Sequence, residues 1–520
     1  MTNISTEKSH LHIVASNSFW NSINFFVTLF LGFLVSVILT RYLGPSRYGV
    51  YSYAITLVTV SAMFLDFGIG QAINKYIPRY YDDENNKGLA VNLYKKTLYL
   101  KLISAIILLV ISLLSFGFIQ RLVNIDSSSS STILLITLFS VLPAVMSSHI
   151  VNYLTATQNF RKIVISNTLA QLFNISLVIC IVIFKFDLIF AIAVPMLVNV
   201  FLALTLYFNV KPLLVYSKTP TKTLAKNDVI NFCSMAYLNT IIQFIVWSYS
   251  EIFFLNRYAP TREIGFYSLA FGLSAMISSL PNLFLKVIYN AQFELMEKGE
   301  HDRADQMTFM SIKYISMIFL PLGIFLSFFM VNISRLLYGH GYEKVGIIFP
   351  IILFGTLLST TMSPLTLKIV NNNKKFRMII FMSIGGAVLN ILLDIALIHR
   401  FSSVGAGVAN FVSQFSVLVF SLIYILGTTS FAFNWKPLIK VYALNLLTGV
   451  MVLLAAIIVT NLWIKIVFAL VLVAFYLQIL RIAGIFSNDD LLIINSLKNF
   501  IPKKAQPVIN LITKYIEKAV

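Results

Sequence analysis

The stretch RYLGPSRYGVYSYA occupies residues 41–54, and a related stretch, RYAPTREIGFYSLA, occupies residues 257–270. The two align without a gap at an offset of 216 residues. A second pair aligns at the same offset: FRKIVISNTLAQLFNISLVI at residues 160–179 and FRMIIFMSIGGAVLNILLDI at residues 376–395. Because shared hydrophobicity alone gives no fixed offset, two separate matches at one offset indicate an internal duplication.

The composition is typical of a membrane protein. Of the 520 residues, 58% are hydrophobic and 11% are charged, whereas a soluble protein carries about 25% charged residues. Windows of about 20 apolar residues, the length that crosses a bilayer as a helix, recur along the chain. We therefore expect an all-α membrane protein with about 14 transmembrane helices. The chain offers no polar stretch long enough to form a soluble domain.

The duplication sets the predicted architecture. The offset contains six predicted helices, and an even number leaves the two copies parallel, related by an axis along the membrane normal. We expect two parallel six-helix bundles that face each other across a cleft and rock to open it to alternate sides. The predicted parts are an N-terminal bundle at 1–210, a cytoplasmic linker at 211–228, a C-terminal bundle at 229–430, two additional transmembrane helices at 431–485 and a cytoplasmic amphipathic tail at 486–520.

The repeated stretch is the predicted outer turn between the first two helices of each bundle. Gly44 and Pro45 favour a tight turn in the first copy. Gly49 and Gly265 occupy matching positions, and glycine permits a close approach of neighbouring helices. The two copies are therefore predicted to form equivalent corners at one surface of the membrane.

The charge distribution predicts the orientation in the membrane. The formal net charge is +19, but the basic residues are scattered among loops, which does not indicate a nucleic-acid partner. Lys and Arg are far more frequent on the side that holds both termini. The positive-inside rule therefore predicts a multi-pass protein of the cytoplasmic (inner) membrane with both termini in the cytoplasm. Cys180 and Cys233 lack metal-ligand spacing, and no metal or cofactor is predicted.

Ionisable residues within or beside membrane spans are candidates for function. Three acidic residues are candidates to take a coupling proton or Na⁺: Asp66, Glu251 and Asp394. Four basic residues are candidates to attract a diphosphate or an acidic sugar: Arg41, Arg257, Lys101 and Lys286. The alternative for each is an anchor at the water–lipid boundary, because all of them are predicted near the ends of spans.

Uncharged polar and aromatic residues give a second set of candidates for the substrate cavity. Asn174 and its repeat mate Asn390 are polar positions within predicted helices, and the alternative is a hydrogen bond between helices. Trp247 and Tyr249 are candidates to stack against sugar rings. The alternative for these two is the aromatic belt at the membrane surface.

The C-terminal tail has a pattern of its own. Ser487 and Asp490 have the spacing of a capping box that opens a short helix. Residues 507–518 place apolar residues on one helical face and lysines elsewhere. We expect an amphipathic surface helix attracted to anionic lipid, with a partner-binding tail as the alternative.

Three segments carry a resemblance to a known family. VILTRYLGPSRYGVYSYAITLVTVSAMFLDFGIGQAINKYI at residues 37–77 resembles the start of the polysaccharide transporter branch of the MOP superfamily, which includes the Wzx-type flippases of O-antigen and capsule units. WSYSEIFFLNRYAPTREIGFYSLA at 247–270 is similar to the family's seventh-to-eighth helix segment, in which an acidic residue, here Glu251, precedes the outer turn. Residues 371–414 resemble the tenth-to-twelfth helix region, and the resemblance covers most of residues 15–427.

The resemblance implies a MATE/MOP-like fold and a flippase that moves undecaprenyl-diphosphate-linked oligosaccharides to the outer face of the membrane. The implied partners are the lipid-linked oligosaccharide, H⁺ or Na⁺, membrane lipids, and a polysaccharide polymerase with a chain-length regulator. Two alternatives remain in the same superfamily, a cation-coupled multidrug or metabolite antiporter and a lipid II flippase. Lipid II flippases carry several arginines in cavity helices, and this chain has none within a predicted span. An enzyme is not expected, because the predicted outer loops are too short to hold a catalytic domain.

Overall fold

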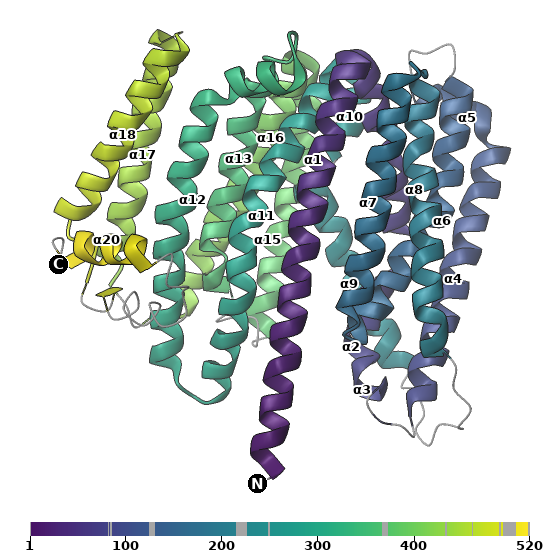
Figure 1. The fold of residues 1–520 in the computed structure, drawn as a ribbon, viewed down its shortest axis with the longest axis horizontal. Helices are drawn as coiled ribbons and strands as arrows, with labels where there is room; N and C mark the ends of the chain where they lie inside the picture. The colour runs from purple at the N-terminus through teal and green to yellow at the C-terminus, as the bar shows by residue number, and fades with distance from the viewer. Residues whose placement is uncertain are drawn as a thin grey trace. The chain divides into compact units, whose positions relative to one another are not determined.

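The computed structural model describes residues 2–81, 83, 86–123, 130–214, 226–247, 250–366, 373–431, 434–459, 461–487, 490–491 and 506–517. Every regular element in these ranges is a helix (Figure 1). The first elements are α1 (Thr2–Phe64), α2 (Ile69–Tyr76), α3 (Pro78–Tyr81), α4 (Lys87–Leu114), α5 (Phe116–Leu122), α6 (Ser130–Ala156), α7 (Phe160–Ile183), α8 (Leu188–Val210) and the short 3-10 helix η1 (Lys211–Leu214). The later elements are α9 (Lys226–Trp247), α10 (Ser250–Tyr258), α11 (Thr261–Glu297), α12 (His301–Tyr338), α13 (Val345–Met362), α15 (Asn373–Leu393), the π-helix η2 (Asp394–Ile398), α16 (His399–Thr428), α17 (Lys436–Ile458), α18 (Leu462–Ile482) and α20 (Gln506–Glu517).

The described helices match the predicted number of membrane crossings. Twelve helical stretches are long and apolar enough to cross a membrane. Two of them, Phe19–Phe64 and Met378–Thr428, are each about twice the length of a single crossing. Each contains one residue with a left-handed backbone, Gly44 (φ 71°) or Ser402 (φ 51°), where two helices join at a kink. Counted as pairs, these two stretches bring the total to the predicted fourteen.

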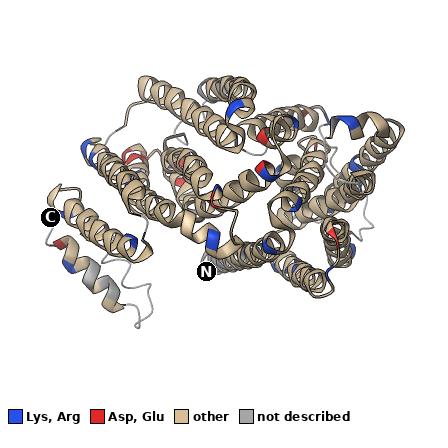
Figure 2. Ribbon diagram, turned by 90° about the horizontal axis from the view of Figure 1, so that it is seen from above, with Lys and Arg blue, Asp and Glu red and all other residues tan. Residues whose placement is uncertain are grey.

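Charged residues are sparse on the helices. Figure 2 shows them as small separate blue and red patches on ribbons that are otherwise tan. The predicted turn at Gly44 and Pro45 is a kink between two consecutive helices, because glycine adopts the left-handed backbone without strain and the proline lies in the first turn of the second helix. The all-α membrane fold predicted from the sequence is therefore confirmed.

The chain divides into two compact units. The first comprises Met1–Leu269, Leu337–Tyr342 and Ser383–Asn410. Its core includes a cluster contributed by α2, α4 and α6, with Ile73, Tyr94 and Tyr153 almost fully buried. The second unit comprises Ala270–Leu336, Glu343–Met382 and Phe411–Val520.

The two copies of the repeated corner meet inside the first unit. A Cβ atom on Gly265 would lie 3.2 Å from the backbone nitrogen of Gly49 and 2.8 Å from the carbonyl oxygen of Pro45. A Cβ atom on Gly49 would overlap the backbone carbonyl of Thr261. The matching glycines therefore permit the predicted close approach of helices, and the helices that approach are the two copies of the corner themselves.

The second unit attaches the C-terminal segment to its helices. Ile324 and Phe328 on α12 pack against Val452 on α17 and Leu472 on α18. Past α18, the buried carboxylate of Asp490 forms an ion pair with Lys313 on α12, with Nζ 2.6 Å from Oδ2. The same oxygen accepts a hydrogen bond from the backbone nitrogen of Ser487 at 2.7 Å. This bond is the carboxylate half of the predicted capping box.

Candidate functional site

Glu251 lies at the centre of a buried polar site in the first unit. It occupies the first turn of α10, where the positive end of the helix dipole favours an acidic side chain. The residue is fully buried. Its Oε1 accepts hydrogen bonds from the side-chain amide of Asn410 at 2.8 Å and from that of Asn390 at 3.2 Å. Ser250 in turn donates to the amide oxygen of Asn390 at 3.2 Å, which fixes the orientation of that amide.

Asp394 adds a second buried carboxylate to the same site. It opens the π-helical segment η2 and lies one helical turn after Asn390, so both side chains project from the same side of the chain. Short π segments within helices frequently mark functional sites. Asp394 is fully buried, neither of its carboxylate oxygens has a hydrogen-bond partner in the described part of the chain, and it interacts electrostatically with Glu251. We call Glu251, Asp394, Asn390 and Asn410 the acid site.

The acid site lacks a compensating positive charge. Among the described residues, no basic side chain forms an ion pair with Glu251 or Asp394. Burying two like charges without compensation is costly in free energy. The chemistry of the site therefore favours a bound proton or a small cation with oxygen ligands. The described residues contain no group of three or more His, Cys, Asp or Glu side chains with metal-binding geometry.

A second charged site in the same unit contains two opposite charges that neutralise each other. Asp66 lies in the turn after α1, and its Oδ1 accepts a hydrogen bond from the Lys101 ammonium on α4. Its Oδ2 accepts a hydrogen bond from the backbone nitrogen of Gly70 at 3.0 Å. The Lys101 side chain is 2% exposed and that of Asp66 is 23% exposed. We call Asp66 and Lys101 the paired site; neither charge is left over for an ion or a phosphate.

The exposed part of Asp66 faces a cavity of about 520 Å³ in the first unit. Amide and hydroxyl side chains line it together with that carboxylate: Thr59, Gln71, Asn74, Ser148, Asn152, Asn199 and Thr240. The other lining residues that the structure describes are apolar or glycine: Ile55, Val58, Ala62, Met63, Gly70, Ala144 and Pro195. None of the lining residues that the structure describes carries an aromatic ring or a basic side chain. Amides and hydroxyls both donate and accept hydrogen bonds, so this polar cavity suits an uncharged, hydroxyl-rich ligand.

A glycine shapes the wall of the polar cavity. A Cβ atom on Gly70 would lie 2.6 Å from the side-chain nitrogen of Asn152 and 3.2 Å from Oδ1 of Asp66. Glycine at this position therefore lets the Asn152 amide approach the backbone beside Asp66. Sequence reasoning singled out Asp66 but did not select Gln71, Asn74 or Asn152. The available signal was the pattern of α2, which places amides on the face opposite buried Ala72 and Ile73.

The remaining candidates lie elsewhere. Arg41 is exposed, and its Nε donates to the carbonyl oxygen of Leu337 at 2.6 Å. Arg257 is exposed in the last turn of α10. Neither belongs to the acid site or the polar cavity. Asn174 is half-buried on α7, while the side chains of Trp247 and Lys286, and Tyr249 as a whole, lie outside the described residues.

About fourteen membrane-length helices, an internal repeat, and buried polar sites define a multi-pass α-helical membrane protein. The fold is that of the MOP superfamily. A structure titled lipid II flippase MurJ, in an inward closed conformation, superposes with a TM-score of 0.67 at 15% identity, covering 88% of this chain and 98% of that one. A multidrug resistance MATE family transporter in an inward-facing conformation gives 0.63 at 14% identity, covering 78% and 96%.

The outward-facing conformation of a MATE family transporter gives a TM-score of 0.51 at 16% identity, covering 80% of this chain and 96% of that one. Among curated proteins, no relative matches this chain. The model of the polysaccharide biosynthesis protein family matches residues 14–296, more than half of the chain. The chain belongs to this family. The predicted membership in the polysaccharide transporter branch of the MOP superfamily is confirmed, and the structural neighbours are transporters and flippases rather than enzymes.

Proposed function

We propose that the protein is a flippase that moves undecaprenyl-diphosphate-linked oligosaccharide units, such as O-antigen or capsule repeats, across the cytoplasmic membrane. The family supplies the link to polysaccharide biosynthesis. A glycan cannot cross hydrocarbon unaided, because its hydroxyl groups would lose their hydrogen bonds to water. The observation that carries the proposal is the polar cavity, whose amides and hydroxyls can replace those hydrogen bonds.

The acid site is proposed to couple transport to a cation gradient. A ligand shifts a conformational equilibrium only by its difference in affinity between the two states. Two uncompensated carboxylates held on α10 and η2 give a proton or Na⁺ a site whose affinity depends on how those elements are placed. Movement of α10 relative to η2 would therefore be linked to cation binding and release.

The paired site argues against the antiporter alternative. An antiporter that exchanged a cationic drug for a cation in the polar cavity would need an uncompensated carboxylate there. Asp66 is the acidic residue of that lining, and Lys101 already neutralises it. Lipid II remains the other lipid-linked alternative. Among the described lining residues, none is basic, so they offer its diphosphate no cationic partner.

Transport of a lipid-linked glycan places the protein between two other activities. Glycosyltransferases must supply the lipid-linked unit on the cytoplasmic side, where both termini are proposed to lie. A polysaccharide polymerase and a chain-length regulator would consume it on the outer side. Neither of these partners is needed for the flipping step itself.

The function is tested by deleting the gene in its host and following the undecaprenyl-linked glycan. We expect the glycan to accumulate on the cytoplasmic face, and the intact chain to restore its appearance at the outer face. The Glu251→Gln variant, expressed to the same level in the membrane, should not restore it. Normal surface polysaccharide after deletion would disprove the proposed function, and accumulation of lipid II in its place would favour the lipid II alternative.

A further inference from the structure

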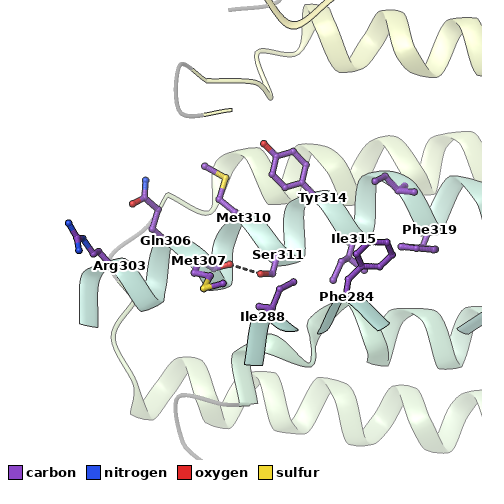
Figure 3. Close-up of a pocket in the computed structure, with 11 residues that line it drawn as sticks. Phe284, Ile288, Arg303, Gln306, Met307, Met310, Ser311, Tyr314, Ile315 and Phe319 are labelled. Atoms are coloured by element: carbon purple, nitrogen blue, oxygen red, sulfur yellow. Dashed lines mark hydrogen bonds between the residues drawn. The ribbon is translucent and has the colours of Figure 1, made fainter. Parts of the chain in front are cut away.

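A groove in the second unit runs between α11 and α12 and has a volume of about 640 Å³ (Figure 3). Phe284 and Ile288 on α11 form one side. The other side is formed by α12, through Arg303, Gln306, Met307, Met310, Ser311, Tyr314, Ile315, Ile318 and Phe319. Apolar side chains dominate this lining, and methionine adapts readily to the shape of a flexible apolar ligand.

Polarity changes along the groove from one end to the other. Arg303 and Gln306 lie at the end near the start of α12, and Phe284 and Phe319 lie at the other end (Figure 3). From Arg303 to Phe319 the helix rises by about 24 Å, at 1.5 Å per residue. One leaflet of a bilayer, including its headgroups, is about 20–23 Å thick. The groove therefore has the length and the polarity of a single phospholipid.

Two side chains of the groove, one on each helix, are open to its surroundings. Phe284 is 58% exposed and Ile318 is 59% exposed. Both helices are long and apolar enough to cross a membrane, so acyl chains of the bilayer could reach these side chains. Arg303 lies two residues after the start of α12, at the polar end of the groove.

Arg303 is available to a phosphate. Its guanidinium pairs with Glu300 at 2.6 Å, and the Arg303 side chain is 74% exposed. Such a surface ion pair stabilises the fold by about 0–1 kcal/mol. A guanidinium can instead bind a phosphate through two parallel hydrogen bonds, which are stronger contacts.

One wall of the groove is fixed from behind. The hydroxyl of Tyr314 donates to Oδ1 of Asp490, whose other oxygen pairs with buried Lys313. The Tyr314 ring therefore has a defined position at the apolar part of the groove. This bond gives the groove at least one lining side chain of fixed position.

We propose that the α11–α12 groove binds one anionic phospholipid, with its phosphate at Arg303 and an acyl chain along Met310 and Ile315. A polyprenyl chain fits less well, because it exceeds the length of one leaflet. The proposal is independent of the transported glycan. It concerns a lipid that accompanies the protein rather than its cargo.

The test uses the full chain in phosphatidylcholine vesicles with a trace of phosphatidylglycerol that carries a photoreactive group on its acyl chain. Mass spectrometry then locates the label. We expect enrichment on Met310 and Ile315 relative to exposed Val467 and Leu470 on α18, and no such enrichment with photoreactive phosphatidylcholine. Arg303→Glu should lower the labelling about tenfold, the factor that corresponds to 1.4 kcal/mol. Met310→Trp, which fills the groove, should lower it as well.

Arg335→Glu is the matched control. Arg335 also lies on α12 and also forms a surface ion pair, with Glu343 at 3.1 Å, but it is not part of the groove. We expect this variant to label like the unmodified chain. Equal labelling of the groove and α18, equal labelling by the two phospholipids, or equal losses in Arg303→Glu and Arg335→Glu would each overturn the proposal. Displacement of phosphatidylglycerol by a polyprenyl diphosphate would also overturn it, by assigning the groove to the cargo lipid.

Discussion

The acid site and the paired site lie in the same unit but handle buried charge in opposite ways. In the paired site, Asp66 and Lys101 neutralise one another. In the acid site, Glu251 and Asp394 lie near one another, and asparagine amides rather than a basic side chain donate to the Glu251 carboxylate. A buried pair of opposite charges is complete without a ligand, whereas a buried pair of like charges creates a need for one. We infer that the first has a structural role and the second a binding role.

The repeat makes this difference clearer. The position matching Glu251 in the first copy is Val35, and the one matching Asp394 is Val178. The position matching Lys101 in the second copy is Met317. The glycines of the corner match between the copies, whereas these charges of the acid site and the paired site do not. The duplication therefore supplies a symmetric scaffold, while each copy carries its own polar chemistry.

The largest expected effect is the loss of the positive charge in the paired site. Lys101→Met leaves the Asp66 carboxylate without its partner, and removing one member of a buried ion pair destabilises a protein by about 3–5 kcal/mol. Thermal unfolding of the purified chain in detergent measures the change. The double variant Asp66→Asn/Lys101→Met should recover most of the lost stability. A double variant as unstable as Lys101→Met would show that lost packing, rather than an uncompensated charge, causes the defect.

The acid site should respond in the opposite sense. Glu251→Gln removes one of two repelling charges, so we expect unchanged or higher thermal stability together with a transport rate lower by about a hundredfold, which corresponds to ~2.7 kcal/mol. If Na⁺ is the coupling ion, saturating Na⁺ at constant ionic strength should raise the Tm of the unmodified chain, because it binds only the folded state. The variant should lose this rise.

Proton coupling gives a different pattern at the same site. Transport by the unmodified chain would then depend on a pH gradient, without a Na⁺ effect on Tm. Asp394→Asn should share the phenotype of Glu251→Gln. Full transport by both variants would remove the acid site from the mechanism and leave its two carboxylates without an assigned role.

The sequence alone revealed most of the scaffold and only parts of the sites. Apolar windows located the crossings, and the repeat located the corners, because both leave regular patterns. Glu251, Asn390 and Asp394 were each candidates, but their association was not predictable, since Glu251 and Asn390 are 139 residues apart. The partnership of Asp66 with Lys101 was missed for the same reason. Single amides such as Asn152 do not stand out, because isolated polar residues in membrane helices commonly serve interhelical hydrogen bonding.

The shared scaffold can be tested at the glycine contact. Gly265→Ala places a methyl group against the backbone of Pro45 and Gly49, and overpacking of this kind costs about 1–3 kcal/mol. Gly272→Ala is the control on the same helix, because no atom outside its own helical turn lies within 4 Å of the position that the added methyl group would take. We expect a lower Tm for the first variant and an unchanged or slightly higher Tm for the second. Equal Tm values would mean that the corner tolerates separation of the two copies.

The smallest effect is expected from pH at a third buried charge pair, Lys313 and Asp490 in the second unit. Burial alone raises the pKa of Asp490, but the hydrogen bonds from Lys313 and Tyr314 and the Lys313 charge outweigh it and hold that pKa below its ordinary value of 3.8. A lowered pKa in the folded state stabilises the contact above the ordinary value, and the stabilisation is lost only as pH falls through the lowered pKa. Fluorescence quenching between labels on α20 and α12 should therefore stay constant from about pH 8 to pH 4, well above that range. Asp490→Asn should change the quenching at every pH. A loss of quenching near neutral pH in the unmodified chain would contradict the prediction, because Lys313 and Asp490 neutralise each other in this range.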